Sequence, residues 1–370
     1  MTPAIHQFVA GYAARDAISN EARVLRGVFR SWGCDAAIFS ESRHVPPELR
    51  RDVLDGSEAA GRVQPDDVVL LHLSIGSAVN EIFASLKCRK AILYHNVTPP
   101  RYFETINPQT AYALAKGLKQ VKALACAAEV NLADSRFNAG EIEAMGYRNV
   151  SVLPLVLDFG LIETEPNRRA VRQLQDGRSN VVFVGRGAPN KLLEDVISAF
   201  ACLKRNVEPK ARLIFVGSFA GTEPYLAMLM YQARSFDRDF ADVQFMGSVP
   251  QDVLSAVYRS ASVFLCMSEH EGFCIPIVEA MAHDVPGMAY AAAAVPETMD
   301  GAGVLFDRKD MPSVAEMMGR LIRDRTLRDA VIAGQRERVK RFRSRDLAAE
   351  VLRHLAPLLP RTFLPTGRRA

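Results

Sequence analysis

Hydrophobic and polar positions along this chain alternate between two kinds of segment. Short apolar runs rich in β-branched residues, typical of buried strands, are separated by stretches whose apolar residues recur every three or four positions, typical of helices. In the first half the predicted strands are residues 5–9, 35–39, 67–73, 90–94, 130–133 and 150–155. The predicted helices there are residues 16–32, 78–86, 107–128 and 138–145. This order predicts a parallel, doubly wound α/β sheet.

The periodicity is lost over residues 157–169, where polar residues become frequent, and a second alternation begins at Val181. After the strand at 181, the predicted strands are residues 213–216, 243–245, 263–267 and 287–290, and a last helix covers 345–358. We therefore expect two Rossmann-like domains, residues 1–160 and 161–345, followed by a helix and tail at 346–370. Ligands bind at the carboxyl ends of such strands, so the domains are expected to face each other across a cleft.

Composition narrows the class of protein. The chain has 370 residues, 49% of them hydrophobic, with six cysteines and a formal net charge of +4. The cysteines lack C-x-x-C spacing and most lie in apolar stretches, which favours reduced core thiols of a cytosolic protein over a zinc site or a disulfide framework. No run of eighteen apolar residues occurs, and residues 1–10 do not read as a secretory signal, so neither membrane spanning nor export is predicted.

The basic residues gather at 336–345 and 361–369. Such a run favours a solvated helix face and tail over contact with an anionic membrane or a nucleic acid. Because no aromatic residues are interleaved with these charges, nucleic acid is the weaker of the two functional readings, and no nucleic-acid partner is predicted.

The most informative stretch runs from Glu271 to Met281 and reads E-G-F-C-I-P-I-V-E-A-M. It follows a predicted strand, and Pro276 suits the first turn of a helix. Glu271 therefore lies in a loop at a strand's carboxyl end, and Glu279 lies about one turn into the helix. A carboxylate, a glycine and a helix N-terminus in this arrangement suit a ligand with both hydroxyl and phosphate groups. The alternative is that Glu279 only favours its helix electrostatically and Glu271 is a solvated loop residue.

Residues 271–286, E-G-F-C-I-P-I-V-E-A-M-A-H-D-V-P, resemble the donor-site signature E-G-F-G-x-P-x-x-E-A-M-A-C-G-x-P of the retaining nucleotide-sugar glycosyltransferases of family 4. The departures are Cys274, His283 and Asp284, at positions where Gly, Cys and Gly are commoner. Two further segments occur in the family's order: V-F-V-G-R-G-A-P-N-K, which ends at Lys191, and A-V-P-E-T followed by G-A-G-V-L-F-D, within 294–307. The resemblance implies the GT-B fold, with an acceptor-side first domain, a second domain that binds the nucleotide sugar, and a last helix that packs back on the first domain.

The resemblance also assigns roles to residues. Glu271 and His95, the latter at the end of the strand 90–94, are expected to act at the donor sugar near the reacting carbon. The expected donor-binding residues are Arg186 and Lys191 at the diphosphate, Glu279 at the ribose, and Gly272, Phe273, Cys274 and Ile275 in the loop. Further donor or acceptor contacts are expected at Gly11, Arg15, Ser74 and Val249. Family members commonly carry a glycine pair after the first strand, whereas this chain has A-A-R-D-A with only Gly11 nearby.

Arg186 and Lys191 also make chemical sense without the family. A departing diphosphate gains negative charge, which a planar Arg fork and a Lys ammonium stabilise where a metal would otherwise be needed. No D-x-D type metal motif stands near these residues, so no metal and no cofactor is expected. The alternative is that G-R-G-A-P-N is a degenerate dinucleotide fingerprint of a nicotinamide enzyme, although Asn190 stands at its third glycine.

The sequence therefore predicts a retaining, metal-independent glycosyltransferase. It would move a hexose, such as mannose or glucose, from a nucleotide-diphosphate sugar to a hydroxyl of a saccharide or lipid-linked saccharide, in cell-surface polysaccharide or lipopolysaccharide biosynthesis. The expected location is cytoplasmic, at the inner face of the membrane, where an interfacial helix face would be formed by Lys116, Lys119 and Lys122 with Leu114, Leu118 and Leu124. The rivals are another GT-B enzyme, such as a sugar-nucleotide epimerase or a donor hydrolase, and a non-catalytic nucleotide-sugar-binding protein.

Overall fold

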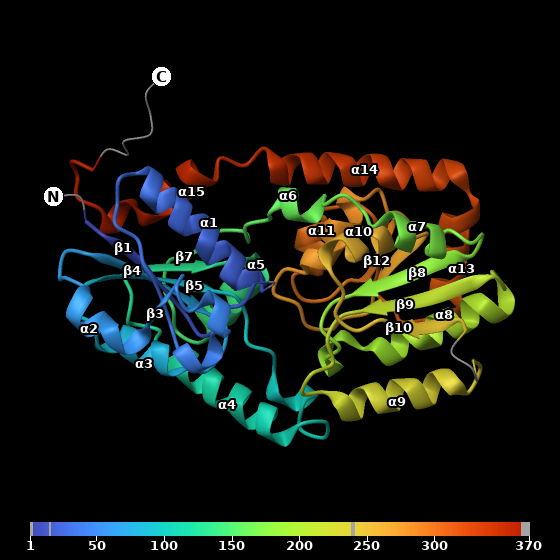
Figure 1. The fold of residues 1–370 in the computed structure, drawn as a ribbon, viewed down its shortest axis with the longest axis horizontal. Coiled ribbons are helices and arrows are strands. Elements are labelled where there is room, and N and C mark those ends of the chain that lie inside the picture. Colours follow the sequence, from blue (N-terminus) through green and yellow to red (C-terminus); the bar gives the residue numbers. More distant parts are fainter. Residues whose placement is uncertain (1–2, 15, 238–240, 364–370) are drawn as a thin grey trace. The chain divides into compact units, whose positions relative to one another are not determined.

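The computed structural model describes residues 3–14, 16–237 and 241–363. The chain divides into two compact units (Figure 1). The first unit comprises Met1–Pro100, Ala111–Leu157 and Arg345–Ala370, and the second comprises Arg101–Thr110 and Asp158–Ser344. Each unit contains one sheet, and every strand pair in both sheets is parallel. The α/β class predicted from the alternation is therefore confirmed.

The first unit's seven-stranded sheet has the order β3-β2-β1-β4-β5-β6-β7. Its strands are β1 (Ile5–Val9), β2 (Ile38–Ser40), β3 (Leu54–Asp55), β4 (Val68–Leu73), β5 (Arg89–Tyr94), β6 (Val130–Ala133) and β7 (Val150–Val152). Every residue of β1 and β4 is buried, as expected for parallel strands covered by helices on both faces.

The helices of the first unit are α1 (Ala17–Ser31), α2 (Ala59–Arg62), α3 (Ala78–Ser85), α4 (Pro108–Ala123, whose first residues belong to the second unit), α5 (Arg136–Ala144) and α15 (Leu347–Leu355). Helix α1 begins where the Asp16 side chain accepts a hydrogen bond from the Ser19 amide at 2.8 Å. Helices α1 and α15 share one hydrophobic core with the sheet, through Phe29, Leu355 and Ile5 among others (Figure 1). The last helix thus belongs to the first unit although it lies at the end of the chain.

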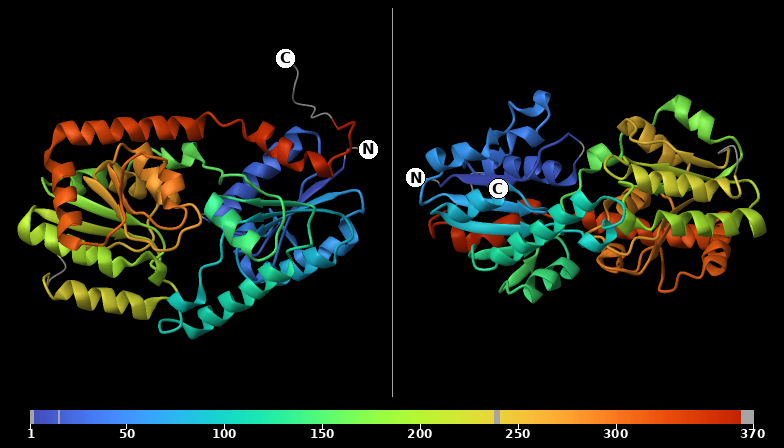
Figure 2. Two further views of the ribbon diagram at one scale, coloured as in Figure 1. Left: turned by 180° about the vertical axis from the view of Figure 1, so that it is seen from behind. Right: turned by 90° about the horizontal axis from the view of Figure 1, so that it is seen from below.

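The second unit's six-stranded sheet has the order β10-β9-β8-β11-β12-β13. Its strands are β8 (Ser179–Val184), β9 (Ala211–Val216), β10 (Val243–Phe245), β11 (Val263–Cys266), β12 (Gly287–Tyr290) and β13 (Val304–Phe306). Its helices are α6 (Phe159–Ile162), α7 (Arg168–Leu174), α8 (Leu193–Asn206), α9 (Glu223–Arg234), α10 (Gln251–Arg259), α11 (Ile275–Ala282), α12 (Val295–Met299), α13 (Met311–Arg323) and α14 (Arg325–Arg343). Residues of α8, α9 and α13 pack with the sheet in one core, whereas α11 packs against α14 (Figure 2).

Several predicted boundaries were wrong. Helix α4 ends at Ala123 instead of residue 128, β2 starts at Ile38 instead of residue 35, and the two short strands β3 and β13 were not predicted. The stretch 157–169 is not structureless, because it contains α6, whose first turn is capped by the side chain of Asp158. Residues 101–110 join the second unit, where Asn107 Nδ2 donates to Gly221 O at 2.8 Å. Contacts between residues so far apart in sequence leave no periodic signal.

Among the described residues, no helix combines the length and apolar character needed to cross a bilayer.

Candidate functional site

Residues from two loops meet at the carboxyl edge of the second unit's sheet. Strands β8 and β11 are parallel neighbours, so the loops that follow them leave the sheet at the same edge. Lys191 follows β8 and Glu271 follows β11, and Lys191 Nζ lies 2.5 Å from Glu271 Oε1. Two residues predicted to serve one ligand are therefore in direct contact.

Two cationic side chains lie on the loop that follows β8. Burial lowers the pKa of Lys191, but the neighbouring Glu271 carboxylate outweighs that effect, and the pKa ends above its ordinary value. Lys191 is therefore an ammonium at neutral pH. Arg186 is exposed, and its Nη2 donates to Ala220 O at 3.3 Å. An ammonium and an exposed guanidinium on one loop are suited to binding a phosphate group.

The N-terminus of α11 supplies further donors. Cys274 caps this helix with φ 73°, a left-handed conformation that explains why related signatures carry glycine there. Asp284, the other position where glycine is commoner, also has a positive φ of 57°. Within the described part of the chain, no acceptor receives a hydrogen bond from the amides of Gly272, Phe273, Cys274 or Ile275. These N–H groups at a helix N-terminus form an anion-binding position.

Glu279 is held by a residue that the sequence analysis missed. Tyr258 of α10 donates its hydroxyl to Glu279 Oε2 at 2.7 Å, and the His283 ring stacks on Tyr258 with centroids 5.1 Å apart. Burial raises the pKa of Glu279, and the Tyr258 hydrogen bond opposes that rise in part. No motif marks Tyr258, because it reads as an ordinary apolar position of α10 and only the fold brings it to Glu279.

Asn190 joins the two loops. Its Nδ2 donates to His270 O at 2.9 Å, and its carbonyl accepts from the Glu269 amide at 3.0 Å. The side chain of Thr298 donates to Phe273 O, which fixes the same loop from the other side. Asn190, which stands at the third glycine of a dinucleotide fingerprint, therefore has a structural role that a glycine could not fill.

The remaining predicted contacts are less distinctive. Val249 is half-buried after β10, Ser74 is half-buried after β4, and Gly11 lacks a positive φ. Arg15 lies outside the described residues. Gly76, which follows Ser74, has no positive φ; a Cβ there would lie 2.9 Å from Gly117 Cα, so glycine is needed for close approach to α4.

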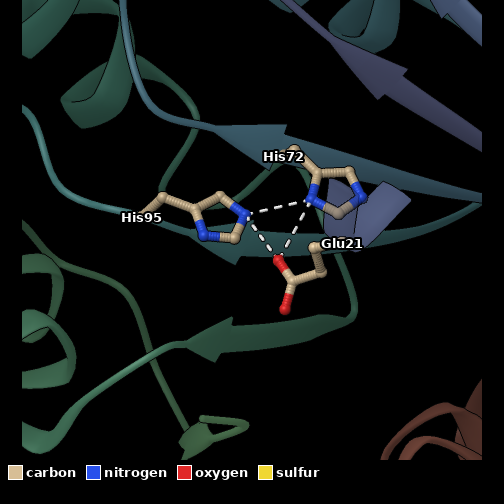
Figure 3. A group of neighbouring side chains, drawn as sticks. All are labelled: Glu21, His72 and His95. Carbon is tan, nitrogen blue, oxygen red and sulfur yellow. Dashed lines mark hydrogen bonds and ion pairs between the residues drawn. The ribbon is translucent and has the colours of Figure 1, made fainter. Parts of the chain in front are cut away.

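His95 lies in a buried polar cluster of the first unit (Figure 3). Its Nε2 is 3.0 Å from His72 Nδ1 and 3.4 Å from Glu21 Oε2, and its Nδ1 is 3.5 Å from Asp134 Oδ2. Burial lowers the pKa of His95, but Glu21 and Asp134 raise it above its ordinary value on balance. Burial also raises the pKa of Glu21 to about 7. The sequence signal for these neighbours was the presence of polar residues, such as His72, inside otherwise apolar strands.

The charged helix faces have structural partners. On α14, Arg336 forms a two-pronged contact with Asp284, and Arg338 and Arg341 both contact Asp300. The interpretation of residues 336–345 as a helix face is therefore supported. On α4, Lys116, Lys119 and Lys122 are exposed. Leu114 and Leu124, however, are 7% and 4% exposed and face the core, so the apolar half of the predicted interfacial face is wrong.

Comparison with known proteins assigns a family to the second unit. Residues 164–341 match the family model "Glycosyl transferases group 1". The O-antigen chain mannosyltransferase B of Escherichia coli is 24% identical over 161 residues, which are 44% of this chain and 41% of that protein. The GDP-mannose:cellobiosyl-diphosphopolyprenol alpha-mannosyltransferase of Xanthomonas oryzae pv. oryzae is 33% identical over 151 residues, 38% of this chain and 37% of that protein. The match thus spans well under two thirds of each relative.

Solved structures resemble the whole chain. HepE of Anabaena, in complex with UDP and glucose, superimposes with a TM-score of 0.73 at 18% identity, over 96% of this chain and all of HepE. Sucrose-phosphate synthase of Thermosynechococcus elongatus gives a TM-score of 0.72 at 17% identity, over 96% and 99% of the two chains. At this level of identity the likeness establishes the fold alone. Residues 164–341 therefore match the group 1 glycosyltransferase family, and the chain has the GT-B fold.

Proposed function

We propose that this protein is a retaining, metal-independent glycosyltransferase that moves a hexose from a nucleotide-diphosphate sugar to a hydroxyl acceptor. The observation that carries the proposal is the edge of the second sheet, where cations from the β8 loop meet a carboxylate from the β11 loop. The amides at the start of α11 lie in the same β11 loop. This edge offers separate partners for the phosphate and hydroxyl groups that a nucleotide sugar carries.

Each residue has a part in binding the donor. Arg186, Lys191 and the amides of residues 272–275 bind the diphosphate, and Glu279 accepts hydrogen bonds from the ribose hydroxyls. Glu271 accepts from hydroxyls of the sugar while it remains paired with Lys191. Because Tyr258 already donates to Glu279 Oε2, the carboxylate is held in place before the nucleotide arrives.

The transfer step needs no protein nucleophile. The bond between the anomeric carbon and the diphosphate oxygen breaks, and the diphosphate leaves with that electron pair. The acceptor oxygen bonds to the same carbon from the face that the diphosphate leaves, and its proton passes to a phosphate oxygen. Arg186 and Lys191 stabilise the charge that develops on the diphosphate, which is the role that preorganised cations serve best.

Mannose is the sugar that we propose, because the two relatives described above are named as mannosyltransferases. One of them is named for an acceptor on a polyprenol diphosphate, which motivates a saccharide or lipid-linked saccharide acceptor in cell-surface polysaccharide synthesis. A panel of nucleotide sugars in a thermal-unfolding assay tests the donor. GDP-mannose should raise the unfolding midpoint of the wild type most, and the Glu279→Gln variant should show a smaller rise. An equal response to every nucleoside diphosphate, unchanged in Glu279→Gln, would contradict the assignment.

Retention and metal independence are tested in the same reaction. With an α-linked donor, the product's anomeric proton should show an α linkage by NMR. Transfer should persist in excess chelator, because Arg186 and Lys191 occupy the place of a metal. Activity that vanishes with chelator and returns with Mg²⁺ or Mn²⁺ would contradict the proposed chemistry. Release of free sugar without an acceptor product would favour a donor hydrolase, and binding without turnover would favour a non-catalytic protein.

Peripheral membrane contact would rest on charge alone. Lys116, Lys119 and Lys122 are exposed on α4, whereas the neighbouring Leu114 and Leu124 are buried. Each lysine near an anionic surface contributes about 1 kcal/mol, so the attachment would be weak and reversible. The wild type should sediment with anionic vesicles at low salt and be released by high salt, and replacement of the three lysines by Glu should abolish sedimentation. Equal sedimentation of this variant would remove the proposal.

A further inference from the structure

Three potential ligand atoms converge at one point inside the first unit. The atoms are Glu21 Oε2 from α1, His72 Nδ1 from β4 and His95 Nε2 from the residue after β5 (Figure 3). The two ring nitrogens are 3.0 Å apart, and Glu21 Oε2 lies 3.4 Å from His95 Nε2 and 3.7 Å from His72 Nδ1. All three residues are buried. The two histidines are 23 residues apart on neighbouring parallel strands, so only the sheet brings them together.

The neighbours of the two rings indicate which ring nitrogens carry protons. Gln7 Nε2 donates to Ala22 O at 2.9 Å, so its Oε1 is the atom that faces His72 Nε2, also at 2.9 Å. An amide oxygen only accepts, so His72 carries its proton on Nε2. His95 Nδ1 makes no hydrogen bond among the described residues, but it faces the Asp134 carboxylate at 3.5 Å, whose negative charge favours a proton on Nδ1.

The inner nitrogens are therefore lone-pair acceptors in the neutral rings. They face each other at 3.0 Å, and they face Glu21 Oε2, for which no hydrogen-bond partner exists among the described residues. Three acceptors that converge in a buried space, without a donor, repel one another unless a cation lies between them. An added proton, on His95 or on the Glu21 carboxyl, supplies the missing donor, and a metal ion is the other solution.

We propose that Glu21, His72 and His95 bind a divalent transition metal ion, with zinc as the best fit. Zinc bonds to nitrogen and oxygen at about 2.0–2.1 Å, which places tetrahedral ligands roughly 3.3 Å apart. The three separations observed here bracket that value. Two imidazoles with one carboxylate are also a ligand set that zinc accepts, and the fourth position remains for water.

The surroundings match those of metal-binding histidines. Such residues typically pass their outer N–H to a carboxylate or carbonyl oxygen, which fixes the ring and its tautomer. Gln7 does this for His72, whereas Asp134 faces His95 Nδ1 at 3.5 Å without a hydrogen bond, and Asn138 Nδ2 donates to the other Asp134 oxygen. A divalent ion would also balance the negative charge that Glu21 and Asp134 carry when both are ionised. The ion would be held by α1, by β4 and by the residue that follows β5, with further contacts from Gln7 of β1 and from Asp134 after β6.

Zinc binding by the full chain tests this site without reference to activity. The purified protein is stripped with a chelator, dialysed, and titrated with Zn²⁺ while binding and thermal unfolding are measured. We expect one zinc ion per chain and a higher unfolding midpoint. Glu21→Gln should bind at least tenfold more weakly, and Gln7→Ala should also lose tenfold or more although it does not touch the ion. His44→Ala, which removes an exposed histidine outside the cluster, should bind as the wild type.

A second group of candidate ligands, Cys266, Glu271 and Cys274 in the second unit, needs its own control. Cys274→Ala should leave zinc uptake unchanged. If the cluster variants fail to fold, Co²⁺ replaces Zn²⁺ in the wild type, and a visible spectrum without thiolate-to-cobalt charge transfer supports the proposal. Either of two zinc results with the stripped protein would overturn the proposal: no stoichiometric uptake by the wild type, or unchanged affinity in Glu21→Gln. Loss of zinc uptake in Cys274→Ala, or a thiolate band in the cobalt spectrum, would overturn it as well.

Discussion

Removal of Arg186 and removal of Lys191 should have the same effect on transfer and different effects on stability. Each residue is proposed to stabilise the departing diphosphate, and loss of one preorganised contact costs roughly 10²-fold in turnover, about 2.7 kcal/mol. Arg186 is exposed, and its one hydrogen bond among the described residues is to a backbone carbonyl, at 3.3 Å. Arg186→Ala should therefore change the free energy of unfolding by less than about 0.5 kcal/mol.

Lys191→Ala leaves the Glu271 carboxylate without its partner at 2.5 Å. An unpaired charge in a fully buried position costs about 3–5 kcal/mol. The side chains of Lys191 and Glu271 are 20% and 10% exposed, so water relieves part of this cost, and we expect about 2–3 kcal/mol. In Lys191→Ala/Glu271→Gln the second change removes the unpaired charge, and stability should recover by about 1–2 kcal/mol without recovery of transfer.

Urea unfolding monitored by circular dichroism measures the stability, and nucleotide release from the donor in the presence of acceptor measures transfer. Arg325→Ala, at a fully exposed position of α14, is the matched control and should change neither quantity. Full activity of Arg186→Ala or Lys191→Ala would remove the diphosphate assignment. Equal stability of Lys191→Ala and the wild type, or no recovery in the double variant, would refute the reasoning about the ion pair.

Three further predictions concern the second unit. Gly217→Ala should destabilise this unit by about 3 kcal/mol or more, because the residue has φ 146° and an added Cβ would lie 1.8 Å from Gly185 O. Gly334→Ala, in α14 with open space around it, should instead stabilise the protein by about 0.5–1 kcal/mol. Equal unfolding midpoints of the two variants would contradict both expectations. Tyr258→Phe should weaken nucleoside-diphosphate binding by roughly tenfold in calorimetry, because it removes one hydrogen bond to a carboxylate. The pKa of Glu279, already raised by burial, should rise further in this variant, so the defect should grow as the pH falls and the carboxylate protonates; a pH-independent defect would argue against this role. Asn190→Ala should lower the free energy of unfolding by about 1–3 kcal/mol and lower turnover as well, since the Asn190 side chain connects the β8 and β11 loops. A variant with wild-type stability and turnover would show that this hydrogen bond is dispensable.

Local sequence determined the type of most elements. The apolar runs at residues 5–9, 130–133, 243–245 and 287–290 became β1, β6, β10 and β12 with the predicted bounds. The loop that contains Glu271 and the helix that contains Glu279 also lie where the motif placed them, because Pro276 is favoured in the first turn of a helix and apolar residues follow it. These features depend on neighbours in sequence, which a pattern records.

Tertiary structure decided which side chains meet. Lys191 and Glu271 are brought together because β8 and β11 are neighbours in the sheet although they are not consecutive in the chain. The contacts of Tyr258 and Asn190, and the convergence of Glu21, His72 and His95, could not be predicted for the same reason, since each contact joins elements whose pairing no local pattern specifies. Periodicity fixes which face of an element is buried, whereas strand order fixes what that face touches, and strand order is a property of the whole sheet.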